Sequence, residues 1–147
     1  MRTAVITGGG RGIGAAISKQ LAVDGYRILL TYCTSSKPAE MLVDEIRDSG
    51  IDAVAVNCDV LDSREVALLA THPWVIEGID VLVLNHGRYD RIDAKDLELE
   101  HLRRTMATNF EGAFLVWNAT KSFVTPEARI WVIGRLLGTR GSPEGAD

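Results

Sequence analysis

The sequence lacks any hydrophobic run of the roughly 18 to 20 residues that a membrane-spanning helix needs. It also lacks the charged start, apolar centre and small-residue cleavage site of a secretory signal peptide, because the chain enters an expected strand at once. These absences predict a cytoplasmic chain with no membrane partner.

Cysteine is scarce, and the two present are Cys33 and Cys58. Their spacing fits neither a metal-binding motif nor a disulfide framework. Both fall near the ends of expected strands, where a cysteine usually serves as a small buried hydrophobe. We therefore expect no metal site and two buried thiols.

Positive charge is in deficit, since 16 Lys and Arg face 20 Asp and Glu, giving a net charge of −4. A broad nucleic-acid footprint needs the opposite balance, so no nucleic-acid partner is predicted. Internal repeats, low-complexity tracts and linkers are also absent. The length of 147 residues, with 46% hydrophobic and 24% charged residues, predicts a single globular domain over residues 1–147.

What the sequence does have is a dense cluster of glycines near its start. A short apolar run at residues 4–6 leads directly into residues 7–14, which read TGGGRGIG. Apolar residues then recur at helical spacing until Asp24-Gly25 gives a stop signal. The segment predicts a strand, a glycine loop and a helix, the first half of a nucleotide-binding βαβ unit. The helical positions are Ile13, Ala16, Ile17, Leu21 and Ala22.

Glycines at these positions allow a strand to turn tightly into a helix while a phosphate group approaches the main chain. The unpaired N–H groups of the first turn and the positive end of the helix dipole then form an anion site, to which Arg11 adds a cation. A plain flexible turn is the alternative, but the flanking strand and helix favour phosphate binding. A P-loop is disfavoured because no Gly-Lys-Ser/Thr follows.

The rest of the chain alternates between expected strands and helices. The expected helices begin at Pro38, at Asp62 or Ser63, and at Leu97; Pro73 interrupts the second, and the third closes near Thr125-Pro126. Such alternation specifies an α/β fold, a doubly wound parallel sheet of right-handed crossovers, with its ligand at the C-terminal strand ends. The expected later strands are residues 27–32, 53–57, 80–84 and 129–133.

Four motifs in order resemble those of the short-chain dehydrogenase/reductase family. The string at residues 7–14 is similar to the family's TGxxxGxG, and Asp59-Val60 looks like its adenine-contacting pair. Leu84-Asn85-His86-Gly87 is similar to NNAG, with Leu for the first Asn and His for Ala, and Asn109 matches the helix asparagine of the catalytic tetrad. The resemblance includes members that reduce 3-oxoacyl thioesters, and it implies a Rossmann-type fold and hydride transfer between a nicotinamide and a small carbonyl or alcohol substrate.

The resemblance also assigns roles to individual residues. It implies that Asn109 is catalytic, although alone it would pass for a polar helix residue. Asp59 is on its own equally well explained as a turn or cap residue. Asn85 is expected to bond neighbouring loops as well as to line the cleft, and His86 is interpreted as a loop histidine without a role. The implied cofactor-binding residues are Gly8, Gly10, Arg11, Gly12, Ile13, Gly14, Tyr32, Thr34, Ser35, Asp59, Val60, Asn85 and Gly87.

Charge indicates which dinucleotide is preferred. NAD-specific sites usually carry an acid about 20 residues after the glycine loop to hold the ribose hydroxyls, whereas a 2′-phosphate needs donors or cations there. No acid occurs between Gly25 and Ala39, while residues 31–37 supply hydroxyls and the Lys37 ammonium, with Arg11 on the same side. The sequence therefore favours NADP(H) over NAD(H), the alternative being a polar loop that lacks acids by chance.

The family's other catalytic groups are not visible in these 147 residues. The family places a Ser at the end of strand five and a Tyr-x-x-x-Lys on the next helix, where the Tyr transfers the proton and the Lys lowers its pKa. Here Gly134-Arg135 stands at the Ser position, and Ser142 falls several residues beyond it. Relative to the family, the fold is expected to be truncated after the fifth strand, and the chain by itself a poor catalyst.

Truncation would leave residues 130–133 as an apolar sheet edge, an aggregation hazard unless something covers it. We therefore expect an incomplete gene product or a chain that depends on a partner, either a second copy or a complementing chain. The leading hypothesis is an NADP-dependent oxidoreductase. The alternatives are a non-catalytic dinucleotide-binding module or partner of an active homologue, and a Rossmann protein of another family, since Gly10-x-Gly12-x-x-Ala15 also fits GxGxxG/A.

Overall fold

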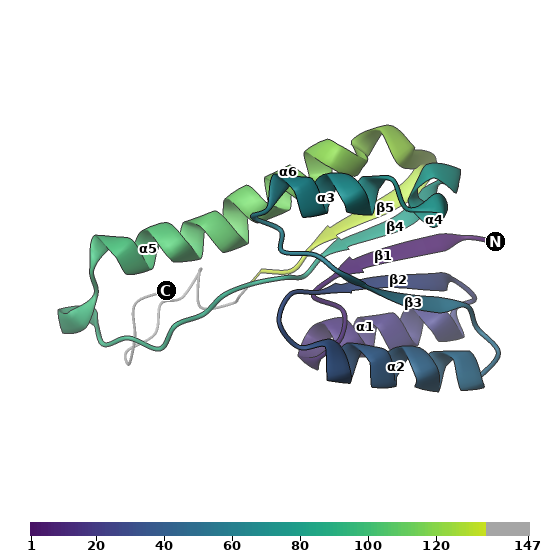
Figure 1. Cartoon of the computed structure of the whole chain (residues 1–147), viewed down its shortest axis with the longest axis horizontal. Coiled ribbons are helices and arrows are strands. Elements are labelled where there is room, and N and C mark those ends of the chain that lie inside the picture. The colour runs from purple at the N-terminus through teal and green to yellow at the C-terminus, as the bar shows by residue number, and fades with distance from the viewer. Residues whose placement is uncertain (135–147) are drawn as a thin grey trace.

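A computed structural model of the chain describes residues 1–134. Its centre is one parallel sheet of five strands in the order β3-β2-β1-β4-β5 (Figure 1). The α/β class and the parallel sheet predicted from the sequence are confirmed. The strands are β1 (Thr3–Thr7), β2 (Arg27–Tyr32), β3 (Ala53–Asn57), β4 (Ile79–Leu84) and β5 (Val124–Val132).

Helices cover both faces of this sheet, as Figure 1 shows. One face carries α1 (Gly12–Val23) and α2 (Ser36–Asp48), and the other carries α3 (Ser63–Ala70), α4 (Pro73–Glu77) and α6 (Gly112–Thr120). A long helical arm projects beyond the strand ends and enters α6; it consists of α5 (Leu99–Met106) and the π-helical turn η2 (Ala107–Glu111). Two short 3-10 turns are η1 (Ala94–Asp96) and η3 (Lys121–Phe123).

Alternate residues of the central strands are buried on opposite faces. In β1, Ala4 and Ile6 pack into the core beneath α1 and α2, while Val5 packs into the core on the other face. Leu29 of β2 and Leu82 of β4 join Val5. Both faces are apolar because helices cover both, which explains why these strands appear in the sequence as continuous hydrophobic runs.

The order of the strands fixes where a ligand can bind. From β1 the chain moves outward through β2 and β3, then returns to the other side of β1 for β4 and β5. Thr7 pairs with Leu84 at the C-terminal ends of β1 and β4, where the direction of winding reverses. This switch point is the expected binding position in a doubly wound sheet, and the glycine loop starts there.

The buried face of α1 differs from the expected one. Ile13 and Ala16 are exposed, whereas Gly14 and Ser18 are buried together with the expected Leu21 and Ala22. Ser18 is tolerated inside because its hydroxyl donates to the carbonyl groups of Gly14 and Gly9 at 2.9 and 3.3 Å. The helix packs closely against its own glycine loop, and that contact decides which side is buried.

Several boundaries also differ from the prediction, among them α5, which begins at Leu99 instead of Leu97, and β5, which begins at Val124 instead of residue 129. Helix α2 starts at Ser36, two residues before Pro38, and Pro73 starts the short helix α4, whose first turn is capped by His72. The long helical region ends at Phe123, so Thr125-Pro126 lies inside β5. Pro126 is accommodated because the pairing of β5 with β4 is irregular between Val124 and Arg129, where a missing N–H leaves no gap in the ladder.

None of the helices within residues 1–134 combines the length and the apolar character that a membrane crossing requires.

Candidate functional site

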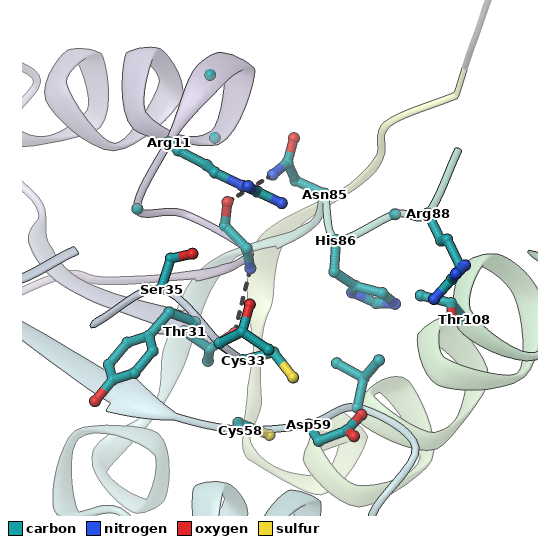
Figure 2. A pocket seen from close by; sticks show the side chains of 18 of the residues that line it. Arg11, Thr31, Cys33, Ser35, Cys58, Asp59, Asn85, His86, Arg88 and Thr108 are labelled. Atoms are coloured by element: carbon teal, nitrogen blue, oxygen red, sulfur yellow. Dashed lines mark hydrogen bonds between the residues drawn. The ribbon is translucent and has the colours of Figure 1, made fainter. Parts of the chain in front are cut away.

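A pocket of about 810 Å³ opens at the C-terminal ends of β1 to β4. It contains every residue that the sequence predicted for cofactor binding, drawn from four segments that are distant in the chain. Figure 2 shows Arg11, Ser35, Asp59 and Asn85 arranged around it. From the glycine loop come Gly8, Gly10, Arg11, Gly12, Ile13 and Gly14; from the end of β2 come Tyr32, Thr34 and Ser35; and from beyond β3 and β4 come Asp59, Val60, Asn85 and Gly87.

The first turn of α1 opens into this pocket without a cap. Arg11 is the N-cap residue, its side chain makes no capping hydrogen bond, and no acid occurs in the first turn. Gly12 begins the helix with a φ of 55°, and a Cβ built on it would have no atom of residues 1–134 within 4 Å outside its chain neighbours and its own helical turn. The N–H groups of this turn have no intrahelical partners, so with the help of the helix dipole they can donate hydrogen bonds to an anion such as a phosphate group, as helix N-termini generally do.

Gly14 brings the helix against the glycine loop. A Cβ at this position would lie 2.4 Å from the Gly8 carbonyl oxygen and 2.5 Å from Nδ2 of Asn85. No other residue type fits without moving the main chain. Here the missing Cβ makes room for the protein's own loop, while the open space for a ligand lies beside Gly12.

Asn85 joins the loop after β4 to the loop after β1. Its Nδ2 donates to the carbonyl oxygens of Thr7 at 3.1 Å and of Gly8 at 3.0 Å. Its own N–H donates to Oγ1 of Thr7 at 3.0 Å. The predicted bonding between neighbouring loops is therefore confirmed, and the same residue lines the pocket.

His86 lies in a loop, as expected, but it is half-buried and hydrogen-bonded. Its Nδ1 is 2.7 Å from Oγ1 of Thr7, and its ring points toward Thr108 (Figure 2). Nε2 is buried and has no hydrogen-bond partner of good geometry within residues 1–134. Burial lowers the pKa of His86 from its usual value, an effect that the Thr108 backbone opposes. The interpretation of His86 as a loop histidine is confirmed, and its contact with Thr7 was not expected from the sequence.

The end of β2 provides the pocket with hydroxyl groups and no carboxylate. Tyr32, Thr34 and Ser35 line this end, and Figure 2 shows Arg11 on the side of the glycine loop. Lys37 lies in α2 and is not among the lining residues. The acid that NAD-specific sites carry here is absent in the structure as it is in the sequence.

The two cysteines lie side by side near this end, because they directly follow the paired residues Tyr32 and Asn57 of β2 and β3. Both line the pocket, but Cys33 is exposed, so the prediction of two buried thiols is wrong for Cys33 and right for Cys58. Burial and the carboxylates of Glu65 and Asp59 raise the pKa of Cys58 to about 12. Burial, then the same two carboxylates, raises the pKa of Cys33.

Asp59 takes the turn role expected of it, and its carboxylate also faces the pocket. Its Oδ1 accepts the N–H of Leu61 at 3.0 Å, which is the turn role, and its N–H donates to Glu65 at 2.6 Å. The same carboxylate faces the pocket in Figure 2. A structural and a binding role are therefore compatible at this residue.

Asn109 lies at the centre of η2, exposed and just outside the pocket. Its neighbour Thr108 lines the pocket, and its own side chain bonds the main chain of Arg88, which also lines it. A π-helical turn inside an α-helix is frequent at functional sites because it displaces one residue from the regular helix.

Ten lining residues were not among those predicted for cofactor binding: Thr31, Cys33, Pro38, Cys58, Leu61, His86, Arg88, Tyr89, Asp90 and Thr108. Thr31 accepts the Gly8 N–H at 3.2 Å, and its place at the end of an expected strand beside the glycine loop could have indicated it. His86 departs from the family's pattern at its position and Arg88 lies just after the motif, so neither gave a signal.

Gly134 follows β5 at the position where the family resemblance places a catalytic serine. Arg135 and Ser142 lie outside the described residues. Within residues 1–134, no group of three or more His, Cys, Asp or Glu side chains is arranged to hold a metal ion.

Comparisons with known proteins agree with this geometry. Residues 2–146 match the family model for short chain dehydrogenases. Elsinochrome reductase 1 of Elsinoe fawcettii is 33% identical over 97% of the chain and 54% of its own length. The 3-oxoacyl-[acyl-carrier-protein] reductase of Staphylococcus aureus is 30% identical over 97% of the chain and 59% of its own length. The chain thus spans little more than half of these relatives.

Solved structures have the same arrangement. A short chain dehydrogenase from Burkholderia cenocepacia in complex with NADP has a TM-score of 0.90 and 32% identity, covering 98% of this chain and 59% of its own. A blue fluorescent protein from a metagenomic library in complex with NADPH has a TM-score of 0.87 and 33% identity, covering 98% and 60%. With the family model extending through the glycine loop, the loop after β4 and the π-helical turn, the chain belongs to the short chain dehydrogenase family.

Proposed function

We propose that this chain binds NADP(H) and forms the cofactor-binding portion of an oxidoreductase that transfers hydride between the nicotinamide and a carbonyl or alcohol. One observation carries the proposal: the uncapped start of α1, the hydroxyl-rich end of β2 and the Asn85 loop open into one pocket of about 810 Å³. A pocket of this size falls in the usual range for small-molecule and cofactor sites.

Each segment has a part in holding the dinucleotide. The first turn of α1 binds the pyrophosphate through main-chain N–H groups, as helix N-termini bind anions generally. Asp59 and Val60 contact the adenine, with the Asp59 carboxylate accepting from its amino group. Asn85 and Gly87 line the cleft, and Asn85 keeps the glycine loop in shape through its bonds to Thr7 and Gly8.

The choice of NADP(H) rests on charge at the ribose end. Arg11, Thr34 and Ser35 offer a cation and two hydroxyl donors, and no carboxylate from the end of β2 opposes a 2′-phosphate. The similar structures from Burkholderia cenocepacia and from the metagenomic library hold NADP and NADPH. We infer the same preference for this chain.

For catalysis we propose only the reaction class of the family, which is hydride transfer between the nicotinamide and a carbonyl or alcohol. The bound nicotinamide supplies or accepts the hydride. Asn109, the residue that matches the asparagine of the family's catalytic tetrad, contributes as a positioning residue, through the loop that it holds beside the pocket. The substrate is a small carbonyl or alcohol compound, and a complementing chain or a second copy is the expected macromolecular partner. A cytoplasmic location stays a prediction from the sequence.

A second candidate is a non-catalytic dinucleotide-binding module. Gly134 favours it, because this position at the end of β5 carries no hydroxyl to polarise a carbonyl group. The 147 residues contain no Tyr-x-x-x-Lys. The two candidates share the pocket and differ in turnover.

Isothermal titration calorimetry with NADP⁺ and NAD⁺ tests the shared proposal. We expect one site per chain and tighter binding of NADP⁺. Equal affinities would overturn the cofactor preference, and the absence of heat with both would overturn dinucleotide binding. Reduction of a panel of ketones and 3-oxoacyl thioesters by NADPH then separates the candidates: turnover supports the oxidoreductase, and binding without turnover supports the module.

A further inference from the structure

The hydroxyl group of Thr7 lies where β1 and β4 end, and it has four polar neighbours. The N–H groups of Asn85 and His86 donate to its Oγ1 at 3.0 and 3.3 Å. Nδ1 of His86 lies at 2.7 Å and the Val83 carbonyl at 3.3 Å. A hydroxyl has two lone pairs and one proton. The two amides occupy the lone pairs, so the proton goes to the shorter of the other contacts, Nδ1 of His86.

This assignment places the proton of the neutral His86 ring on Nε2. A proton on Nδ1 would be a third donor aimed at one oxygen from 2.7 Å. Gly112 of α6 leaves the space for the other edge of the ring, since a Cβ there would lie 3.2 Å from Nε2. His86 is therefore held as a neutral acceptor between β1 and α6.

The same hydroxyl connects His86 to the glycine loop. By accepting the N–H of Asn85, it holds the residue whose Nδ2 donates to the carbonyl groups of Thr7 and Gly8. Those bonds set the path of the loop that enters α1. The imidazole thus acts on the pocket through Thr7 and Asn85, without needing to touch the ligand.

Protonation of His86 in acid would reverse the direction of the 2.7 Å hydrogen bond between Nδ1 of His86 and Oγ1 of Thr7. Protonated His86 is a donor at both ring nitrogens, so Nδ1–H would compete with two amides for one oxygen. The hydroxyl proton would have to turn to Val83, at the longer distance of 3.3 Å. Because burial lowers the pKa of His86, this change occurs at a lower pH than for an ordinary histidine.

We propose that His86 is a positioning residue whose protonation weakens dinucleotide binding by loosening the Thr7–Asn85 connection. The inference deepens the proposed function, because it concerns the same pocket. A bound pyrophosphate would act in the opposite direction, since a nearby anion favours a protonated ring. The sign of the pH dependence therefore separates a hydrogen-bond role from a simple field effect.

The charged groups on the elements around the ring have little influence on it. These groups are Asp59 beyond β3, Arg88 on the same loop, Glu111 next to Gly112, and Arg11 across the glycine loop. The pKa of His86 responds to burial and to the Thr108 backbone, and no charged side chain of residues 1–134 contributes to its shift. At the pH values where histidines titrate, acid therefore acts on the Thr7–His86 hydrogen bond through protonation of His86 itself.

The test is the ratio of NADP⁺ dissociation constants at pH 5.5 and pH 7.5, measured by calorimetry on the wild-type chain and on His86→Asn. Asparagine keeps an acceptor near the position of Nδ1 and cannot titrate. We expect NADP⁺ binding to the wild-type chain to weaken in acid more than binding to His86→Asn, by at most about tenfold, because the lowered pKa lies below the reference value near 6.5. The 2′-phosphate titrates near pH 6 in both, so its contribution cancels.

His72→Asn is the matched control, because burial also lowers the pKa of His72, which lies outside the pocket. It should keep the wild-type ratio. The inference would be overturned if the ratio of dissociation constants at pH 5.5 and pH 7.5 were the same for the wild-type chain and His86→Asn. It would also be overturned if acid tightened wild-type binding relative to the variant. Neither result would affect the proposal that the chain binds a dinucleotide. Nitrogen-15 NMR of the ligand-free chain at neutral pH tests the inference without any binding measurement, because it shows which ring nitrogen of neutral His86 carries the proton. A proton on Nε2 supports the inference, and a proton on Nδ1 overturns it. Failure to bind NADP⁺ at either pH would instead overturn the proposed function.

Discussion

Asn109 holds the main chain of Arg88 at both ends. Its Oδ1 accepts the Arg88 N–H at 2.7 Å, and its Nδ2 donates to the Arg88 carbonyl oxygen at 3.0 Å. These two bonds join the π-helical turn η2 to the loop that follows β4, directly after Gly87. An asparagine amide is suited to this task because it carries a donor and an acceptor on one rigid group.

Replacing Asn109 by alanine should free the Arg88 amide. We expect its hydrogen exchange to accelerate at least about tenfold, and the free energy of unfolding to fall by about 1 kcal/mol because the lost bonds are exposed. Asn118→Ala on α6 is the matched control, since Asn118 is an exposed asparagine whose Oδ1 contacts Lys121 instead. Unchanged exchange at Arg88 in Asn109→Ala would contradict this role.

A methyl group at Gly14 should disturb the fold and the pocket together. Its Cβ would meet the Gly8 carbonyl oxygen at 2.4 Å, and main chain cannot yield as a flexible side chain does. We expect Gly14→Ala to lose about 1 to 3 kcal/mol in urea unfolding and to lose NADP⁺ binding. Gly134→Ala, where no atom of residues 1–134 other than those of the chain neighbour lies within 4 Å of the added Cβ, should change neither. Wild-type affinity in Gly14→Ala would refute the close approach.

Some features of the fold and of the pocket could be predicted from the sequence, and others could not. The loop, the strands and the pocket residues follow from local patterns, because turns, helix starts and doubly covered strands leave signatures within a few residues. The buried face of α1 does not, since Ser18 is inside only because its partner carbonyls are there. His86 was missed for a related reason: its partner Thr7 is 79 positions away, and only the fold brings them together.

A carboxylate at the end of β2 should weaken binding of the phosphorylated cofactor. Tyr32 is the last residue of β2, and it follows the glycine loop at the distance where NAD-specific sites carry their acid. We expect Tyr32→Asp to weaken NADP⁺ binding about tenfold relative to Tyr32→Asn, through repulsion of the 2′-phosphate, with no such loss for NAD⁺. The asparagine control has the same shape without the charge. Equal losses for both cofactors would place the 2′-phosphate elsewhere.

The two neighbouring thiols should differ sharply in reactivity. The pKa of Cys58 is about 12 and the thiol is buried, so iodoacetamide at pH 8 should leave it unmodified while the chain is folded. Cys33 is exposed and should react, more slowly than a free thiol because its pKa is also raised. Saturating NADP⁺ should protect Cys33, since it lines the pocket.

Mass spectrometry of tryptic peptides reads the two sites separately, because Arg47 lies between them. Unfolding in urea is the control and should make both thiols reactive. Modification of Cys33 at the same rate with and without NADP⁺ would show that the dinucleotide does not cover this end of the pocket.

The outer strand β5 should drive self-association. In the sheet formed by residues 1–134 it is an edge strand, and Ile130, Trp131 and Val132 are 42%, 41% and 69% exposed. Apolar edge strands pair with other chains unless a charge blocks them. Val132→Lys should therefore shift the chain toward a smaller species in size-exclusion chromatography and reduce light scattering on concentration. Leu68→Lys is the control, because Leu68 is 68% exposed on α3, away from any edge, and the substitution adds the same charge. A wild-type chain that stays monomeric and monodisperse would show that β5 needs no partner. If Val132→Lys and Leu68→Lys reduced association equally, the cause would be net charge and not the edge of β5.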